Sequence, residues 1–276
     1  MMDYKKSILD IIVVDGQSNA EGNGLSTDDT VEVRSDVFEL IDFNNYWMEI
    51  PDPKNPILRM TLPVQCKVQC LQESYRGPLP ASHLSFGFVD EYIKAGLLKE
   101  GHKIMVVKTA VGGTGFALNQ QGIHDILHPR TLDMIDLALS FNPENRIVAF
   151  LWHQGEHDAF ENKDLNDEER YNFYKEKFME KMNDIKTRYK TSKFPIIAGE
   201  FCNEWSDKPE NASKVKVIEK CLKDCVETLG GAMVSSEGLS SNNQEIGNGD
   251  DIHFSKKSLK EFGKRYFEAY NNLRNK

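Results

Sequence analysis

The chain has 276 residues, of which 39% are hydrophobic and 28% are charged, and its formal net charge is −9. This composition is that of an ordinary globular protein and excludes a disordered or fibrous chain. The negative charge, without any block rich in lysine or arginine, argues against nucleic acid or a membrane surface as a partner. Every apolar run is also much shorter than the roughly 20 residues that span a bilayer.

The first residues do not have the pattern of a secretory signal. Their apolar stretch, residues 8–14, is short and is interrupted by Asp10. We therefore expect a cytoplasmic protein, or a secreted one if a signal peptide has been removed. The five cysteines are predicted to be small buried hydrophobic residues, because neither closely spaced pair has the C-x₂-C spacing of a zinc site.

Short apolar runs alternate with helical patterns along the chain. The runs are nearly continuous, as is typical of parallel strands buried on both faces, and lie at residues 8–14, 104–109, 147–152, 195–199 and 232–235. Apolar residues at helical spacing occupy residues 84–98, 129–141, 171–189, 212–229 and 255–273, with Ser255 as the predicted N-cap of the last helix. This alternation predicts one α/β domain over residues 1–276. We expect a three-layer α/β/α sandwich around a flavodoxin-like, five-stranded parallel sheet in the order 2-1-3-4-5.

Residues 36–82 interrupt this rhythm. They contain Trp47 and several prolines, and they show no long helical pattern. A connection of this length in a compact domain is usually functional or carries small strands of its own. We predict an irregular excursion over the edge of the sheet that binds the ligand.

Polar residues and glycines follow the predicted strands. Ser18 follows the first strand, Gly112 and Gly113 the second, Gln154 the third, and Asp250 and His253 the fifth. Because the carboxyl ends of parallel strands meet at one edge of a sheet, these residues should lie close together. They supply what acyl transfer requires: a nucleophile, oxyanion donors, a general base and a group that orients the base.

Each of these features also has an ordinary structural explanation. A serine in a glycine-rich loop is usually a loop residue, and a Gly-Gly-Thr-Gly stretch is usually a turn. Asp250 and His253 could simply cap the helix that follows Ser255. Their predicted meeting at one edge of one sheet is what favours a catalytic interpretation.

Four blocks of the sequence, in order along the chain, resemble those of the SGNH/GDSL hydrolase superfamily. They are Gly16-Gln17-Ser18-Asn19, Val111-Gly112-Gly113-Thr114, Trp152-His153-Gln154-Gly155-Glu156 and Asp250-x-x-His253. Within this superfamily they resemble the carbohydrate esterase branch that holds sialate O-acetylesterases and acetylxylan esterases (carbohydrate esterase family six). The first and third blocks are the specific ones, and the four together span residues 16–253.

The resemblance implies a serine esterase that removes O-acetyl groups from saccharides through an acetyl-enzyme. On this interpretation Ser18 is the nucleophile, His253 is the base, and Asp250 orients His253. The partner is then an acetyl ester of a small molecule or an oligosaccharide, and neither a metal nor a cofactor is needed.

The resemblance also implies an oxyanion hole. Its donors are the backbone N–H of Ser18, the backbone N–H of Gly113 or Gly112, and the side-chain amide of Gln154. Five residues are expected in the pocket or directly behind the catalytic groups: Gln17, Asn19, Gly112, His153 and Glu156.

The sequence departs from the family pattern at Asp15, Ala20 and His157, which affects the pocket and hence the substrate. The family implies acetylated xylan-type oligosaccharides or O-acetyl sialic acids. An acidic protein offers no steering to an anionic sialic acid, which favours the neutral substrates unless an arginine reaches the pocket. The candidate arginines are Arg59, Arg76 and Arg130.

Other interpretations remain open at this stage. The same fold could serve a non-catalytic carbohydrate-binding protein, or an esterase for short-chain acyl esters that are not carbohydrates. Residues 153–157 match the H-x-x-E-H pattern of a metallohydrolase, although Gly155 is a poor residue for the helix that this pattern needs. Ser18 also half-resembles the nucleophile elbow of an α/β-hydrolase, but that serine follows a strand in mid-chain.

Overall fold

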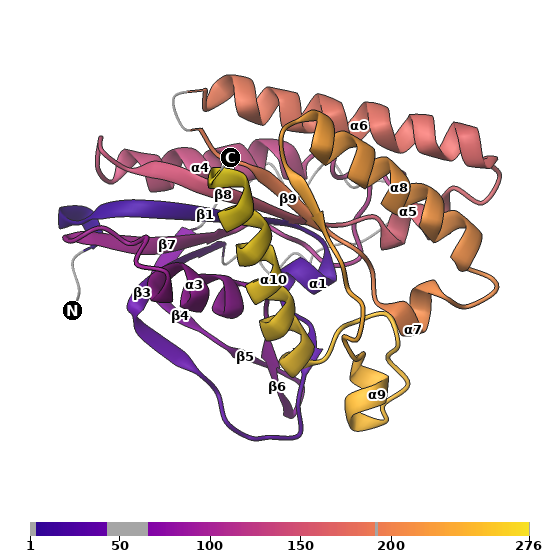
Figure 1. The fold of residues 1–276 in the computed structure, drawn as a ribbon, viewed down its shortest axis with the longest axis horizontal. Coiled ribbons are helices and arrows are strands. Elements are labelled where there is room, and N and C mark those ends of the chain that lie inside the picture. Colours follow the sequence, from indigo (N-terminus) through magenta and orange to yellow (C-terminus); the bar gives the residue numbers. More distant parts are fainter. Residues whose placement is uncertain (1–3, 43–65, 191–192, 276) are drawn as a thin grey trace.

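A sheet runs through the centre of the protein, and helices cover both of its faces (Figure 1). The structure is a computed structural model that describes residues 4–42, 66–190 and 193–275. In these residues the large sheet contains seven strands: β1 (Ile8–Gly16), β3 (Val33–Asp42), β4 (Cys66–Gln72), β7 (His102–Lys108), β8 (Arg146–His153), β9 (Ile196–Gly199) and β10 (Ala232–Val234). Their order across the sheet is β10-β9-β8-β1-β7-β3-β4.

The sheet is larger than the predicted one, and it is mixed. The five predicted strands are present as β1, β7, β8, β9 and β10, which pair in parallel. Strand β3 adds to β7 in parallel, and β4 then pairs with β3 in the antiparallel direction. The prediction of a five-stranded, flavodoxin-like sheet is therefore wrong in strand number. The prediction that all its strands are parallel is wrong because β4 is antiparallel. Strand β1 lies between β7 and β8, so its carboxyl end is in the interior of the sheet.

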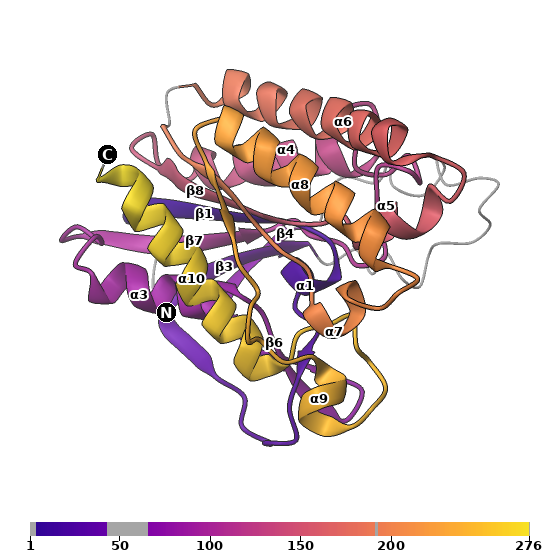
Figure 2. The ribbon, with the colours of Figure 1, turned by 45° about the vertical axis from the view of Figure 1, so that its right-hand side comes forward.

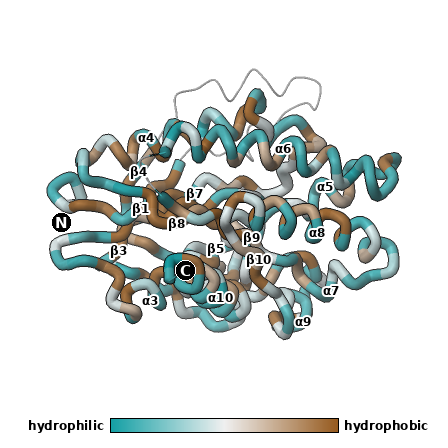
Figure 3. The backbone as a smooth tube through the Cα atoms, turned by 45° about the horizontal axis from the view of Figure 1, so that its top comes forward, coloured by the Kyte–Doolittle hydropathy of each residue, from teal (hydrophilic) through white to brown (hydrophobic). Residues whose placement is uncertain are grey.

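Two apolar cores separate the helices from the sheet. Successive residues of β1 point to opposite faces, so Ile11 and Val13 enter one core while Ile12 and Val14 enter the other. Helices α4 (Leu127–Ser140), α6 (Asp167–Arg188) and α8 (Ala212–Thr228) cover the first face, and α3 (Ser85–Lys94) and α10 (Lys256–Arg274) cover the second (Figures 1 and 2). Figure 3 shows the hydrophobic strands between helices whose outer faces are hydrophilic.

These five helices confirm the helical predictions, with differences of a few residues at their ends. Ser255 caps α10 as predicted, because its hydroxyl oxygen accepts the N–H of Ser258. Helix α6 begins with a capping box between Asn166 and Glu169. The side-chain oxygens of Ser255 and Asn166 therefore set where these two long helices start.

Helices α3 and α10 touch at backbone distance. A Cβ atom at Gly263 would lie 1.9 Å from the carbonyl oxygen of Leu84, and one at Gly87 would lie 1.9 Å from that of Lys260. No side chain fits at either position unless the helices move apart. The two glycines thus allow the C-terminal helix α10 to pack closely against α3.

The stretch 36–82, predicted to be irregular, contributes strands instead. Its first part is in β3 and a later part forms β4. Strands β5 (Ser74–Arg76) and β6 (Leu79–Ser82) join β2 (Gly24–Leu25) in a small second sheet of order β2-β6-β5. The centre of the stretch, including Trp47 and residues 43–65, lies outside the described residues.

Short helices connect the strands to the longer elements. They are η1 (Tyr4–Lys6), α1 (Ser18–Glu21), α5 (Glu156–Glu161), α7 (Asn203–Ser206) and α9 (Asn242–Ile246). In the described part of the chain, no helix combines the length and the apolar character that crossing a membrane requires. The five cysteines are all free thiols, and Cys202, Cys221 and Cys225 are buried as predicted. The prediction is wrong for Cys66 and Cys70, which are only half-buried because they lie on β4 at the edge of the sheet.

Candidate active site

Strands β1 and β8 end side by side, so close that only glycine fits between them. Gly16, the last residue of β1, pairs with His153, the last residue of β8, and its φ is +129°. A Cβ atom at Gly16 would lie 2.1 Å from the carbonyl oxygen of His153. The next residue, Gln17, donates its N–H to that same oxygen over 2.8 Å. The chain then turns directly into Ser18.

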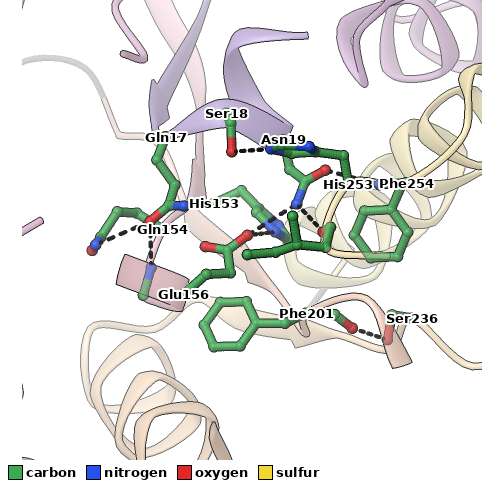
Figure 4. A network of polar contacts seen from close by, with 12 residues as sticks. Gln17, Ser18, Asn19, His153, Gln154, Glu156, Phe201, Ser236, His253 and Phe254 are labelled. Carbon is green, nitrogen blue, oxygen red and sulfur yellow. Dashed lines mark hydrogen bonds and ion pairs between the residues drawn. The ribbon is translucent and has the colours of Figure 1, made fainter. Parts of the chain in front are cut away.

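Ser18, His253 and Asp250 form one hydrogen-bonded line. The Oγ of Ser18 lies 2.8 Å from Nε2 of His253 (Figure 4). On the other side of the ring, Nδ1 lies 2.9 Å from both carboxylate oxygens of Asp250. The side chains of His253 and Asp250 are 23% and 25% exposed, so solvent reaches the pair. The structure thus brings these three predicted residues together.

The surroundings of Asp250 keep it ionised. Burial opposes ionisation, but hydrogen bonds from His253 and from Asn242 outweigh this and lower the pKa of Asp250. The amide of Asn242 donates to Oδ2 over 2.8 Å. An ionised Asp250 accepts the Nδ1 proton of His253, which leaves Nε2 as the acceptor that faces the Ser18 hydroxyl.

The glycine loop after β7 lies against the turn that carries Ser18. Val111 donates its N–H to the carbonyl oxygen of Gly16 over 3.1 Å. Gly112 donates its N–H to Oε2 of Glu21, at the end of α1, over 3.2 Å. In the described residues, the N–H groups of Gly113 and Ser18 have no acceptor. Of the two glycines, Gly113 is therefore the one whose N–H is available to a ligand.

Gln154 is completely buried, and its amide protons already have acceptors. Its Nε2 makes a short hydrogen bond to the carboxylate of Asp158 and longer ones, both 3.3 Å, to Oε1 of Gln17 and the carbonyl oxygen of Thr114. Its own Oε1 accepts the hydroxyl of Tyr174 over 3.0 Å. One proton is thus committed to Asp158, while the other is shared between two weak contacts.

Gln17 links the first and third sequence blocks. Its Oε1 accepts the amide of Gln154 and the backbone N–H groups of Gly155 and His157, over 3.3–3.4 Å. Gln17 is therefore a buried connector between the turn at Ser18 and the start of α5.

Asn19, His153 and Glu156 form a second, fully buried network beside Ser18 (Figure 4). Nε2 of His153 lies 3.2 Å from Oε1 of Glu156, and the Asn19 amide donates to that same oxygen over 2.9 Å. Of the five residues expected in the pocket or behind the catalytic groups, Gln17, Asn19, His153 and Glu156 thus lie in the interior behind Ser18. The fifth, Gly112, is buried in the loop after β7.

Asp158 anchors the loop that follows the glycines, a role that the sequence did not reveal. Its carboxylate accepts the N–H groups of Phe116 and Ala117, over 3.2 and 2.7 Å, and the amide of Gln154. Burial raises the pKa of Asp158 to about 6, although these hydrogen bonds oppose the shift. The position of Asp158 in the sequence does not indicate that it accepts a hydrogen bond from a loop residue 41 positions earlier.

Lys181 is a further buried group. Its place among the apolar residues of α6 is visible in the sequence, although it was not among the predicted site residues. It lies on the apolar face of α6, next to Met182, and its side chain has no exposed surface. Its ammonium lies 3.0 Å from Asp15 and 2.9 Å from Oε1 of Gln121, whose own amide donates to the carbonyl oxygen of Gly16. A lysine within an apolar helical stripe indicates a buried partner, and Asp15 is that partner.

The metallohydrolase alternative does not fit the structure. His153 is the last residue of β8, whereas His157 is in α5, so the two rings do not share one helical face. His153 is held by Glu156 and by the hydroxyl of Tyr266, 3.3 Å from its Nδ1. In the residues that the structure describes, no group of three or more potential metal ligands comes together.

The comparisons with known proteins identify a family for this chain. Residues 8–272 match the family described as carbohydrate esterase, sialic acid-specific acetylesterase. Similar solved structures include NanS (14% identity, TM-score 0.73, 98% of both chains) and a protein from Arabidopsis thaliana (14% identity, TM-score 0.62, 96% of this chain and 98% of that one).

A third similar structure is a carbohydrate acetylesterase from Xanthomonas citri, with 14% identity and a TM-score of 0.53 over 96% of this chain and 56% of that one. At such low identity these structures show the shared fold alone. A comparison with curated protein sequences gave no match. The family match, however, covers nearly the whole chain. This protein therefore belongs to the sialic acid-specific acetylesterase family of carbohydrate esterases and is an ester-hydrolysing enzyme.

Proposed function

We propose that this enzyme removes O-acetyl groups from saccharides with a Ser18-His253-Asp250 triad. The observation that carries the proposal is the line of contacts from Ser18 through His253 to Asp250, each 2.8–2.9 Å long. Nucleophilic catalysis by serine requires this arrangement: a base within hydrogen-bond reach, oriented by a third group. Family membership supplies the reaction class, ester hydrolysis.

In the first half of the reaction, Oγ of Ser18 attacks the carbonyl carbon of the acetyl ester. Nε2 of His253 takes the hydroxyl proton and then gives it to the sugar oxygen as the ester bond breaks. The sugar leaves as an alcohol and the acetyl group stays on Ser18. Asp250 stabilises the imidazolium that forms between these two proton transfers.

In the second half, water attacks the acetyl-enzyme. Nε2 of His253 takes a proton from the water and returns it to Oγ of Ser18 as acetate leaves. The solvent access of His253 and Asp250 suits this step, because the water must approach the same nitrogen that the sugar has left.

The proposed oxyanion hole has two backbone donors and one side-chain donor. The N–H groups of Ser18 and Gly113 have no acceptor among the described residues and can donate. For Gln154 we propose that the proton shared by the two 3.3 Å contacts turns to the oxyanion while the other stays on Asp158. Such donors act where negative charge develops in the transition state.

The family description favours O-acetyl sialic acids, which carry a carboxylate. Arg76 could donate to that carboxylate: its side chain is 38% exposed, and its guanidinium lies 3.2 Å from Glu21, at the end of the helix that Ser18 begins. Arg130 is buried and donates to Asp42 and to the carbonyl oxygen of Thr109, while Arg59 lies outside the described residues. The net charge of −9 is the observation that favours neutral, xylan-type substrates instead.

The test measures acetate release from O-acetyl sialic acids, from acetylated xylo-oligosaccharides and from 4-nitrophenyl acetate. We expect Ser18→Ala to abolish turnover of every substrate that the wild-type enzyme cleaves. Ser85→Ala is the matched control, since Ser85 is also a buried first residue of a helix but its hydroxyl makes no hydrogen bond among the described residues. Turnover by Ser18→Ala at the wild-type rate would contradict the triad, and release from 4-nitrophenyl acetate alone would contradict a saccharide substrate.

A further inference from the structure

The side chain of Asn19 contacts the peptide groups on both sides of His253. Oδ1 of Asn19 accepts the N–H of Phe254 over 3.0 Å, and Nδ2 of Asn19 donates to the carbonyl oxygen of Ile252 over 3.2 Å (Figure 4). Asn19 is completely buried. Neither Ile252 nor Phe254 is in a helix. Besides Asn19, the segment is held by the N–H of Asn242, which donates to the carbonyl oxygen of His253 over 2.8 Å, and by an isolated bridge between Phe254 and Ser241.

Asn19 also immediately follows Ser18 in α1. The same short helix therefore carries the nucleophile and the side chain that grips the backbone of the base. Because the side chains of serine and asparagine are short, the ring and the backbone of His253 can move little relative to α1. The distance of 2.8 Å from Ser18 Oγ to His253 Nε2 is thus set locally, although the two residues are 235 positions apart.

The orientation of the Asn19 amide is fixed in turn by Glu156. The same Nδ2 that reaches Ile252 donates to Oε1 of Glu156 over 2.9 Å, and this carboxylate is completely buried. Burial opposes its ionisation, but the contacts with His153 and Asn19 outweigh this and lower the pKa of Glu156. An ionised carboxylate only accepts hydrogen bonds, so a flipped Asn19 would place two acceptor oxygens against each other.

We propose that Asn19 is a positioning residue for His253, and that the buried Glu156 holds the Asn19 amide in the orientation that this requires. The inference rests on the proposed function, since it gives His253 the role of the base. On this proposal the first and third sequence blocks act together to set the position of a histidine that the fourth block supplies. Loss of the Asn19 amide should let His253 sample positions in which Nε2 no longer faces Ser18.

The test compares Asn19→Ala with Asn145→Ala. Asn145 is also buried and bridges an N–H and a carbonyl group, of Leu9 and Ala138, but at the opposite end of β1 from Ser18. We expect Asn19→Ala to lower kcat for 4-nitrophenyl acetate by roughly 10–10²-fold with KM nearly unchanged, because misplacement by about 1 Å can cost 10²-fold. Asn145→Ala should lose comparable stability and keep kcat.

A second readout does not depend on activity. The Nδ1 proton that His253 shares with Asp250 should give a downfield proton NMR resonance, which Asp250→Ala removes. We expect this resonance to persist in Ser18→Ala and Asn145→Ala, and to broaden or disappear in Asn19→Ala. Wild-type kcat together with an intact resonance in Asn19→Ala would overturn the inference. Turnover by Ser18→Ala would overturn the proposed function, and the resonance would still decide the role of Asn19.

Glu156 provides a second route to the same answer, should Asn19→Ala fail to fold. Glu156→Ala should lower kcat and weaken the resonance, whereas Glu156→Gln should retain most of both, because its amide oxygen still accepts from Asn19. If Glu156 acts through Asn19, the double variant Asn19→Ala/Glu156→Ala should be no slower than Asn19→Ala. Unchanged kcat and resonance in Glu156→Ala, or full additivity in the double variant, would contradict this.

Discussion

The protein contains two histidine–carboxylate pairs with the same sequence spacing and opposite surroundings. In His253–Asp250 and in His153–Glu156 the partners are three residues apart, and the nitrogen–oxygen distances are 2.9 and 3.2 Å. The side chains of the first pair are 23% and 25% exposed, whereas those of the second are 0% and 1% exposed. Spacing and contact distance therefore do not distinguish them, but access to solvent does.

This difference distinguishes His253, the proposed base, from His153, which is enclosed and has a structural role. His253, the proposed base, must exchange its proton with a substrate and with water, which requires a ring that solvent reaches. The ring of His153 is enclosed by Phe201, Phe254 and Phe262, whose centroids lie 5.7–5.9 Å away. A buried pair of this kind holds its neighbours in place and is costly to break, because removing one partner leaves the other charge unsatisfied.

The strongest contrast is expected from removing each histidine. His253→Ala should lower kcat by roughly 10⁴–10⁶-fold and leave the melting temperature nearly unchanged, since its ring is partly exposed. His153→Ala should instead cost roughly 3 kcal/mol or more of folding free energy, because Glu156 is then buried without it. Steady-state kinetics and thermal unfolding of the two variants measure both effects. The comparison breaks if His153→Ala is as stable as the wild type.

A smaller contrast is expected from neutralising each carboxylate. Asp250→Asn should lower kcat by roughly 10²–10⁴-fold, less than His253→Ala, because Asp250 orients the base and transfers no proton itself. Glu156→Gln should cost much less activity, since its amide oxygen can replace the carboxylate as the acceptor for Asn19. Equal losses of kcat in the two variants would mean that the buried pair takes part in proton transfer.

Gln154 tests whether the interior also contributes a donor to the reaction. As an oxyanion donor, its loss in Gln154→Ala should lower kcat by roughly 10²–10³-fold, about 2.7–4 kcal/mol of transition-state stabilisation, with KM nearly unchanged. If Gln154 has only a structural role, Gln154→Ala should lower the melting temperature and leave kcat nearly unchanged. Kinetics on the folded variant decide between these roles, and a near wild-type kcat would leave the hole to the Ser18 and Gly113 N–H groups.

The smallest effect concerns pH and Asp158. Burial raises the pKa of Asp158 to about 6 in the folded protein from the usual 3.8. Between these values the folded protein binds a proton that the unfolded chain does not, so this contribution to stability is fully present below about pH 4 and is lost as the pH rises through about 6. Urea denaturation across this range should show a steeper fall in the wild type than in Asp158→Asn. Parallel curves for the two proteins would contradict the assignment.

Much of the fold was predictable because its central strands are mostly apolar. Strand β1 has eight buried residues in succession, which produces an unmistakable run in the sequence. Strand β3 could not be predicted in this way, because its first half carries charged, mostly exposed residues such as Arg34 and Asp36, and only four residues are buried. Its place in the sheet depends on pairing with β4 and β7, which is a tertiary effect that local patterns do not encode.

The placement of the proposed catalytic residues was predictable for a different reason. Ser18, Gly113 and Gln154 each follow a strand, and parallel strands bring their carboxyl ends to one edge. The groups behind them were not predictable in detail, because hydrogen-bond partners such as Asp158 for the loop at Ala117 are chosen by three-dimensional proximity. Lys181 is the exception, since a lysine within an apolar stripe does signal a buried partner.

The close crossing of α3 and α10 has a consequence for the time at which the enzyme becomes active. Ser18 leaves the ribosome long before His253, which follows it by 235 positions, and α10 is made later still. On the proposed mechanism Ser18 has no base until His253 has been made, and α10, which packs against α3 where Gly263 meets Leu84, begins after His253. We therefore expect the serine to stay unactivated while the intervening residues are made, with α10 the last helix to join the fold.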